Sequence, residues 1–314
     1  MKRKTAVNWM KHRGVFFKRC SIVEKFSLSL SEQLNPSDMK HLDTLTTNPC
    51  AKVNLGLNVT EKRPDGYHNL ETVFVPVPLC DDLTIRIKEE GEDELQLEGI
   101  QLEGNPKDNL VMRAAALLRK SGHEVPPVSI HLKKNIPSGA GLGGGSSDAA
   151  YTLRMLNEML QLGIDRAELM RMAATLGADC AFFIQDAPMF ARGIGDILSP
   201  VELDLSGLWL TLVKPDDFVS TKEAYNGVKP AQPAHPLLQS ISRPIGQWQA
   251  LIENDFEKSI FPAHPAIAQV KQQMLEAGAL YAAMSGSGSS VFGLFDKETH
   301  IDTPYFQFAS PLNN

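Results

Sequence analysis

The chain has 314 residues, of which 43% are hydrophobic and 22% charged, a composition that predicts a globular protein of two modest domains or one large one. A disordered, collagenous or coiled-coil protein is excluded, and no apolar run approaches the roughly 18 residues that a membrane span requires. The net charge is −6, and because basic residues are concentrated in residues 1–25, the rest of the chain is more acidic still. Nucleic acid and membranes are therefore not expected as partners, and any phosphate site must be local.

Four cysteines stand at positions 20, 50, 80 and 180, without a C-x-x-C pair or a histidine pair at zinc-ligand spacing. A zinc site is therefore not expected. The pattern predicts ordinary reduced thiols, which favours a cytoplasmic protein.

Residues 1–48 differ from the rest of the chain because they are basic, rich in serine and without sustained hydrophobic periodicity. They also lack a secretory h-region. We predict a disordered leader, or a start codon assigned too early with Met39 as the true start; an organellar transit peptide is the alternative. The folded part is expected to begin at residue 49.

The first predicted elements are strands. Hydrophobic and polar residues alternate between 53 and 59, which is the period of a half-buried strand. A Pro-Asp-Gly turn follows at 64–66, and residues 67–75 and 82–88 are predicted as two further strands.

Apolar residues recur every three or four positions in the middle of the chain, which predicts helices. Asn109 and Asp165 are candidate N-caps, the latter with Glu168 in a pattern like a capping box. The expected order is a helix over 110–120, a strand at 128–132, a helix that the glycine-rich segment 139–145 begins, and a helix that ends at Gly177.

The second half again mixes strands and helices, so the expected fold class is α+β. Its proline-rich segment 226–246 is predicted as a loop or an insertion. We place the domain boundary between 199 and 206, which gives domains 49–202 and 203–314. The expected elements are strands at 208–213, 280–284 and 291–295 and a helix from Pro265 to Gly278.

The segment 139–144 matches the G-x-G-x-x-G pattern of dinucleotide-binding folds. A Rossmann unit needs a second parallel strand after the helix, but here another helix begins at Asp165. A Walker A loop needs a lysine after its glycines, and Gly144 is followed by Gly145. Both common nucleotide motifs are therefore excluded.

Residues 137–148 nevertheless suit a polyphosphate. Their glycines let the backbone approach a ligand and turn N–H groups toward it, and the N-terminus of the following helix adds partial positive charge. The hydroxyl of Ser146 or Ser147 can contact phosphate or a magnesium ion. A flexible turn without a ligand is the alternative.

At this loop the sequence resembles the GHMP family of small-molecule kinases, in which P-x-x-x-G-L-G-x-G-S-S binds the phosphates of ATP. Further motifs in matching order extend the resemblance over about residues 49–295. They are Pro49-Cys50-Ala51-Lys52-Val53-Asn54-Leu55, Arg63-Pro64-Asp65-Gly66-Tyr67-His68, Leu176-Gly177-Ala178-Asp179 and Met284-Ser285-Gly286-Ser287-Gly288-Ser289-Ser290.

The resemblance implies an S5-like N-terminal domain that binds ATP and a ferredoxin-like C-terminal domain, with the site between them. It also implies that ATP, with Mg²⁺, phosphorylates the 2-hydroxyl of 4-diphosphocytidyl-2-C-methyl-D-erythritol in the non-mevalonate route to isoprenoid precursors. The expected partners are these two small molecules, and the chain is expected to be a monomer or a homodimer.

The resemblance also assigns roles to residues. Asp179 is expected to accept the proton of the substrate hydroxyl, while Lys52 holds Asp179 and the hydroxyl in register and Asn54 lies beside them. Asp148 stands where many relatives have Asn and suits magnesium better than bare phosphate, but no metal ligand is assigned. The expected ATP-binding residues are Pro137, Ser138, Gly139, Ala140, Gly141, Leu142, Gly143, Gly144, Gly145, Ser146 and Ser147.

A second set is expected to bind the acceptor substrate. By the resemblance, Tyr67 stacks on the cytosine, His68 bonds the edge of the base, and Tyr225 closes the sandwich with Thr221 nearby. The turn at 285–290 is expected to approach the substrate diphosphate or the transferred phosphoryl group. Its contributing residues are Gly286, Ser287 and Gly288.

Other interpretations stay open. From pattern alone, Lys52 could be a solubilising residue, Asp179 a turn former, and Tyr67 and His68 ordinary hairpin residues. Another GHMP kinase, of the mevalonate or homoserine type, would have no need for Tyr67 and His68. A non-catalytic RNA-binding module is also considered, because the N-terminal fold resembles one used in the ribosome, but the acidic body argues against it.

Overall fold

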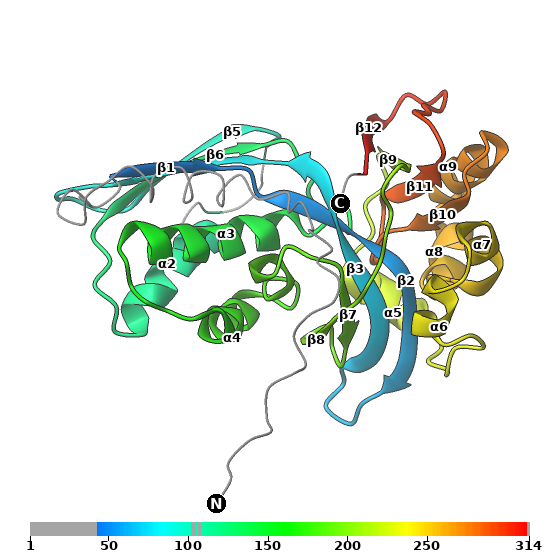
Figure 1. Ribbon diagram of the computed structural model, residues 1–314, viewed down its shortest axis with the longest axis horizontal. Coiled ribbons are helices and arrows are strands. Elements are labelled where there is room, and N and C mark those ends of the chain that lie inside the picture. The colour runs from blue at the N-terminus through cyan, green and yellow to red at the C-terminus, as the bar shows by residue number, and fades with distance from the viewer. Residues whose placement is uncertain (1–42, 102–104, 106–107, 313–314) are drawn as a thin grey trace, which may run out of the picture.

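The structure is a computed structural model that describes residues 43–101, 105 and 108–312 (Figure 1). Its strands form three four-stranded sheets, with orders β1-β4-β6-β5, β2-β3-β7-β8 and β10-β11-β9-β12. The strands are β1 (Thr44–Thr47), β2 (Cys50–Lys62), β3 (His68–Cys80), β4 (Asp82–Ile87), β5 (Glu94–Gly99), β6 (Val128–Lys134), β7 (Met189–Arg192), β8 (Ile197–Pro200), β9 (Trp209–Lys214), β10 (Tyr281–Met284), β11 (Val291–Phe295) and β12 (Phe306–Pro311). The helices are α2 (Leu110–Lys120), α3 (Gly144–Met159), α4 (Arg166–Leu176), α5 (Thr221–Gly227), α6 (Leu237–Ile241), α7 (Trp248–Leu251), α8 (Glu257–Ala263) and α9 (Pro265–Glu276), with 3-10 helices η2 (Phe182–Ile184) and η3 (Ile245–Gln247).

Helices α2, α3 and α4 lie together on one side of the β1-β4-β6-β5 sheet (Figure 1) and share a hydrophobic core with it. Both predicted N-caps are confirmed. The Asn109 side chain accepts a hydrogen bond from Val111 N–H at 3.1 Å, and the Asp165 side chain accepts one from Glu168 N–H at 2.8 Å. Because α3 is packed against the sheet, the position of the glycine-rich segment at its N-terminus is fixed as well.

Strands β2 and β3 form a long antiparallel hairpin around the predicted turn at 64–66. The expected half-burial of β2 is wrong, because residues 51–59 are buried on both faces of the strand. Val53 and Leu55 belong to the hydrophobic core, while Lys52 and Asn54 are only 3% and 2% exposed on the other face. The polar face of this strand is therefore directed into the protein rather than into solvent.

The β10-β11-β9-β12 sheet has the strand order of a ferredoxin-like domain, and all its pairs are antiparallel. Helix α9 packs on this sheet through Ile267, Val270 and Met274. Residues 296–305, all of them described, connect β11 to β12 without the second helix of an ideal ferredoxin-like unit. The predicted α+β class is confirmed. In the described part of the chain, no helix combines the length and the apolar character that crossing a membrane requires.

Some elements are not predicted by the sequence pattern. Strand β1 pairs antiparallel with β4, Leu45 opposite Ile85, although the fold was expected to begin only at residue 49. The rest of the predicted leader, residues 1–42, lies outside the described residues. The proline-rich segment contains α6 and η3 and is therefore not only a loop. Strands β5, β7, β8 and β12 and helix α8 are further additions.

Cys50 and Cys80 form a disulfide between β2 and β3, where the two residues are directly paired. The prediction of reduced thiols is therefore wrong for this pair, because strand pairing joins residues that are 30 positions apart in the sequence. Cys180 is a buried free thiol, and burial raises its pKa to about 11. Cys20 lies outside the described residues.

Candidate active site

The glycine-rich segment connects β6 to α3 and lines a cavity of about 950 Å³. Gly139, Gly141 and Gly143 have φ angles of +61°, +74° and +71°, which glycine adopts without strain. The helix starts at Gly144, so the unpaired N–H groups of its first turn lie at this cavity. Backbone donors and a helix N-terminus together form a site suited to an anion.

The glycine loop is docked on the second small-residue turn, at 285–290. Ser285 Oγ donates a hydrogen bond to Gly141 O at 2.9 Å, and Ser290 N–H donates to Ala140 O at 3.2 Å. A Cβ atom on Gly141 would lie 2.0 Å from Ser285 O, so the close approach of the two turns requires glycine here. The two turns that the sequence predicts for phosphate binding are thus brought together, although they are far apart in the sequence.

Lys52 lies next to both turns. Its Nζ donates hydrogen bonds to Asn54 Oδ1 at 2.6 Å and to Gly141 O at 2.9 Å. The same Nζ is 3.5 Å from Asp179 Oδ2. Asn54 is held in turn by a hydrogen bond from its Nδ2 to Thr72 Oγ1 at 3.0 Å. One buried ammonium group therefore contacts the glycine loop, β2 and the predicted base.

Asp179 lies in the turn between α4 and η2, and its side chain is 31% exposed. Its backbone carbonyl accepts a hydrogen bond from Phe182 N–H at 3.2 Å, which fixes the turn that presents the carboxylate. The carboxylate can therefore meet a ligand while Lys52 orients it. The structure brings the two predicted catalytic residues together.

His68 and Tyr225 form a stacked pair, with ring centroids 5.0 Å apart and planes inclined by 23°. Tyr225 also contacts Phe256 edge-on. Burial, and next the negative charge of Asp179, raise the pKa of Tyr225 to about 12, so this ring lies within the field of the candidate base. Partial burial and the charge of Lys62 lower the pKa of His68, and a neutral imidazole presents one donor and one acceptor.

The remaining residues expected at the cytidine end are less enclosed. Tyr67 is 62% exposed, and the ring that stacks on Tyr225 is that of His68. Thr221 is exposed at the start of α5. Gly286 lies beside Asn54: a Cβ atom there would be 3.3 Å from Asn54 Oδ1.

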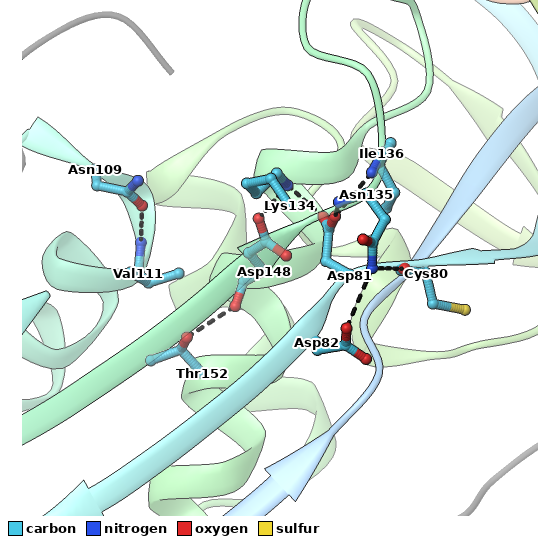
Figure 2. Close-up of polar contacts among 10 residues, drawn as sticks. All are labelled: Cys80, Asp81, Asp82, Asn109, Val111, Lys134, Asn135, Ile136, Asp148 and Thr152. Carbon is cyan, nitrogen blue, oxygen red and sulfur yellow. Dashed lines mark hydrogen bonds and ion pairs between the residues drawn. The ribbon is translucent and has the colours of Figure 1, made fainter. Parts of the chain in front are cut away.

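Asp148 lies in α3 and is 2% exposed. Its Oδ2 accepts a hydrogen bond from Lys134 Nζ at 2.7 Å, and Lys134 also pairs with Asp81 (Figure 2). Burial raises the pKa of Asp148 to about 7, against the opposing effect of the Lys134 charge. One oxygen of this carboxylate, Oδ2, is therefore engaged in an ion pair, while Oδ1 has no hydrogen-bond partner among the described residues. Among the described residues, no three His, Cys, Asp or Glu side chains are grouped to hold a metal ion.

Two further residues at the site lie outside the sequence motifs. Asn254 is 1% exposed, and its Nδ2 donates to Met284 O at 2.8 Å and to Gly286 O at 2.9 Å, which fixes the second turn. Phe218 is 67% exposed, lines the cavity and lies against Gly139. Neither has a local signal in the sequence, because each meets the site only through tertiary packing.

Two segments of the chain, which together make up about half of it, match two family models. The model of the GHMP kinases N terminal domain matches residues 109–193, and that of the GHMP kinases C terminal matches residues 235–309. The fold is similar to the crystal structure of homoserine kinase from Cytophaga hutchinsonii, with a TM-score of 0.58, 21% identity and coverage of 84% of this chain and 88% of that chain. The chain belongs to the GHMP kinase family, and GHMP kinases use ATP as a substrate.

Within this family the similarity to one kind of kinase is much higher. The chain is 54% identical, over 81% of its length and 93% of the relative, to the 4-diphosphocytidyl-2-C-methyl-D-erythritol kinase of Bacteroides thetaiotaomicron. It is also similar to a crystal structure of 4-(cytidine 5′-diphospho)-2C-methyl-D-erythritol kinase, with a TM-score of 0.67, 36% identity and coverage of 80% of this chain and 90% of that chain.

Proposed function

We propose that the protein transfers the terminal phosphoryl group of ATP to the 2-hydroxyl of 4-diphosphocytidyl-2-C-methyl-D-erythritol, in non-mevalonate isoprenoid synthesis, and releases ADP. The observation that carries the proposal is the position of Lys52, which bonds Gly141 of the glycine loop and pairs with Asp179. A donor phosphate on the loop and an acceptor hydroxyl at Asp179 would meet at this ammonium group. The choice of substrate rests on the similarity to the two kinases described above.

Phosphoryl transfer depends mainly on positioning and on electrostatic stabilisation. In the proposed reaction Asp179 accepts the hydroxyl proton while the hydroxyl oxygen bonds to the terminal phosphorus and the bond to ADP breaks. Lys52 orients the Asp179 carboxylate and offsets the charge on the transferred group, and Asn54 holds the ammonium in place. The N–H groups of the glycine loop and of the first turn of α3 bind phosphate oxygens.

Mg²⁺ is the proposed cofactor, and the start of α3 fits a cation that the nucleotide itself largely holds. Mg²⁺ usually keeps several waters and binds one or two protein oxygens together with substrate phosphates. The Ser147 hydroxyl oxygen is buried here and has no hydrogen-bond partner in the part of the chain that the structure describes. Ser146 lines the cavity and is therefore the proposed protein contact, with the buried Ser147 hydroxyl next to it in the chain, and the cation would neutralise charge on the phosphates.

One assay tests the proposed function. ATP consumption by the full chain is measured with the cytidyl substrate, with mevalonate and with homoserine, each with Mg²⁺. We expect turnover with the cytidyl substrate and none above background with the other two. Turnover with mevalonate or homoserine alone would reassign the chain to another branch of the family, and no ATP consumption with any of them would contradict the proposal.

Three rings at this end of the site, those of Tyr67, His68 and Tyr225, support a cytosine site, and their contribution can be measured. Replacing Tyr67 and His68 together with Ala is expected to raise the KM for the cytidyl substrate by about 5- to 150-fold, the effect of losing one stacking contact, and to leave the KM for ATP unchanged. Replacing Tyr225 with Ala is expected to act in the same direction. Phe306→Ala, which removes an exposed ring on β12, is the matched control.

The outcome that contradicts this assignment is specific. If the double variant lost affinity for ATP and kept its KM for the cytidyl substrate, the two nucleotide sites would be exchanged, and the substrate would again be that of an unspecified GHMP kinase.

The proposal extends to the organisation of the chain. We propose that residues 49–202 form the ATP-binding domain and 203–314 the second domain, each supplying one of the two docked turns. Both substrates are charged and water-soluble, which supports a reaction in the cytoplasm, carried out by a monomer or a homodimer.

A further inference from the structure

Both ends of the glycine loop are connected to a buried charge network that the proposed mechanism does not use. The network consists of Asp81 between β3 and β4, Lys134 at the end of β6, and Asp148 in α3 (Figure 2). Their side chains are 0%, 3% and 3% exposed. Burying these charges costs folding free energy unless each charge is well paired. The network is therefore stable only when the three segments that carry it hold one defined arrangement.

Asp81 fixes the chain just before the loop. Its Oδ1 accepts hydrogen bonds from the N–H groups of Asn135 at 2.6 Å and Ile136 at 2.8 Å. The Asn135 side chain adds to this by donating to Cys80 O at 3.0 Å and to Asp82 Oδ2 at 3.2 Å. The residues that lead into the loop are therefore anchored to the β3–β4 connection (Figure 2).

Lys134 carries the connection to the other end of the loop. Its Nζ donates to Asp81 Oδ2 and, at 2.7 Å, to Asp148 Oδ2. A Cβ atom on Gly144 would lie 3.4 Å from this Nζ, so the ammonium is in contact with the first residue of α3. Lys134 and Asp148 line the same cavity as the glycines.

The charges of the network indicate what it does. With one ammonium and two carboxylates, it carries no net positive charge to attract phosphate, and Lys134 is already bonded to both carboxylates. The loop between the two anchored ends contains three glycines with positive φ and has little stiffness of its own. Backbone N–H groups stabilise an anion best when they are held in place beforehand.

We propose that Asp81, Lys134 and Asp148 are positioning residues, which hold the two ends of the glycine loop at the separation that the polyphosphate of a nucleotide requires. They act through the loop backbone and do not touch the phosphates. The inference rests on the proposed function for the identity of the nucleotide.

The test is the binding of ADP to the full chain with Mg²⁺, measured by titration calorimetry. Asp148→Ala removes the partner of Lys134 on the helix side and is expected to raise the Kd for ADP by about 10- to 150-fold, the range for losing a hydrogen bond to a charged group. Asp148→Asn keeps an oxygen that accepts from Lys134 and leaves one carboxylate for one ammonium, so it is expected to bind ADP as the unaltered protein does. In steady-state assays Asp148→Ala is expected to raise the KM for ATP and to leave the KM for the cytidyl substrate unchanged.

A second variant covers the case in which Asp148→Ala does not fold. In Asp81→Asn the amide oxygen must face the N–H groups of Asn135 and Ile136, which turns the amide nitrogen toward Lys134, where two donors meet. This variant is also expected to bind ADP more weakly. The matched control is Arg154→Gln. Arg154 lies further along α3, and its ion pair with Asp186 is lost in this variant, which is expected to lower the Tm without changing the Kd for ADP.

Two results would overturn the inference alone: ADP affinity unchanged in both Asp148→Ala and Asp81→Asn, or Asp148→Asn as weak as Asp148→Ala. Unaltered protein that binds no ADP would overturn the proposed function together with the inference. The two failures are therefore distinguishable.

Discussion

Replacing Asp179 with Asn is expected to lower kcat by about 100-fold or more, the usual effect of losing a positioned general base. The amide has nearly the same shape as the carboxylate but cannot take the proton of the attacking hydroxyl. The fold is expected to survive, because the side chain is 31% exposed and the turn is held by the Asp179 backbone carbonyl. The measurement is kcat with the cytidyl substrate and the Tm of the same preparation.

The control for this variant is Asp196→Asn, which makes the same chemical change at an exposed turn. It is expected to keep the full kcat. A folded Asp179→Asn variant with full turnover would remove Asp179 from the mechanism. A large drop in Tm that accompanies the loss of activity would assign Asp179 a structural role.

Local sequence rules predicted the parts of the fold that depend on neighbours in the chain. The caps Asn109 and Asp165 and the strand character of β2 all follow from residues within a few positions. The same rules failed for β1, because a four-residue strand has too short a pattern to stand out and is stabilised by its pairing with β4. They failed for the cysteines for a similar reason, since only the register of β2 against β3 brings Cys50 to Cys80.

The candidate site was predicted as a set of motifs but not as an arrangement. The loop and the turn at 285–290 were both predicted for phosphates, yet their docking through Gly141 and Ser285 joins residues 144 positions apart. The network around Lys134 was not predicted, because Lys134 ends an alternating strand and Asp81 precedes another, where each reads as a solvent-exposed charge. Whether the polar face of a strand is buried depends on tertiary packing, which neither the hydrophobic periodicity nor the composition of the sequence reveals.

Replacing Lys52 with Met is expected to lower kcat by about 10²- to 10³-fold, the range for removing one group that stabilises charge in the transition state. Met keeps the length and the apolar stem of the side chain in a position that is 3% exposed, but it loses the ammonium group that lies over the Phe74 ring, 5.2 Å from its centroid. The variant leaves Gly141 O and Asn54 Oδ1 without their donor, which is expected to cost about 1–3 kcal/mol of folding free energy for each buried group left unpaired. Arg at this position is not a conservative control, because Lys52 is only 3% exposed and a planar guanidinium group is larger than an ammonium and has a different hydrogen-bonding geometry.

The double variant Lys52→Met with Asp179→Asn separates a shared role from two independent ones. If Lys52 acts by orienting the Asp179 carboxylate 3.5 Å away, the two residues work as a unit. The kcat of the double variant is then expected to be little lower than that of the less active single variant. Losses that multiply in full would mean that Lys52 acts on the transferred phosphoryl group independently of Asp179. Measuring phosphoryl transfer in a single turnover, with both substrates saturating, keeps effects on binding out of the comparison.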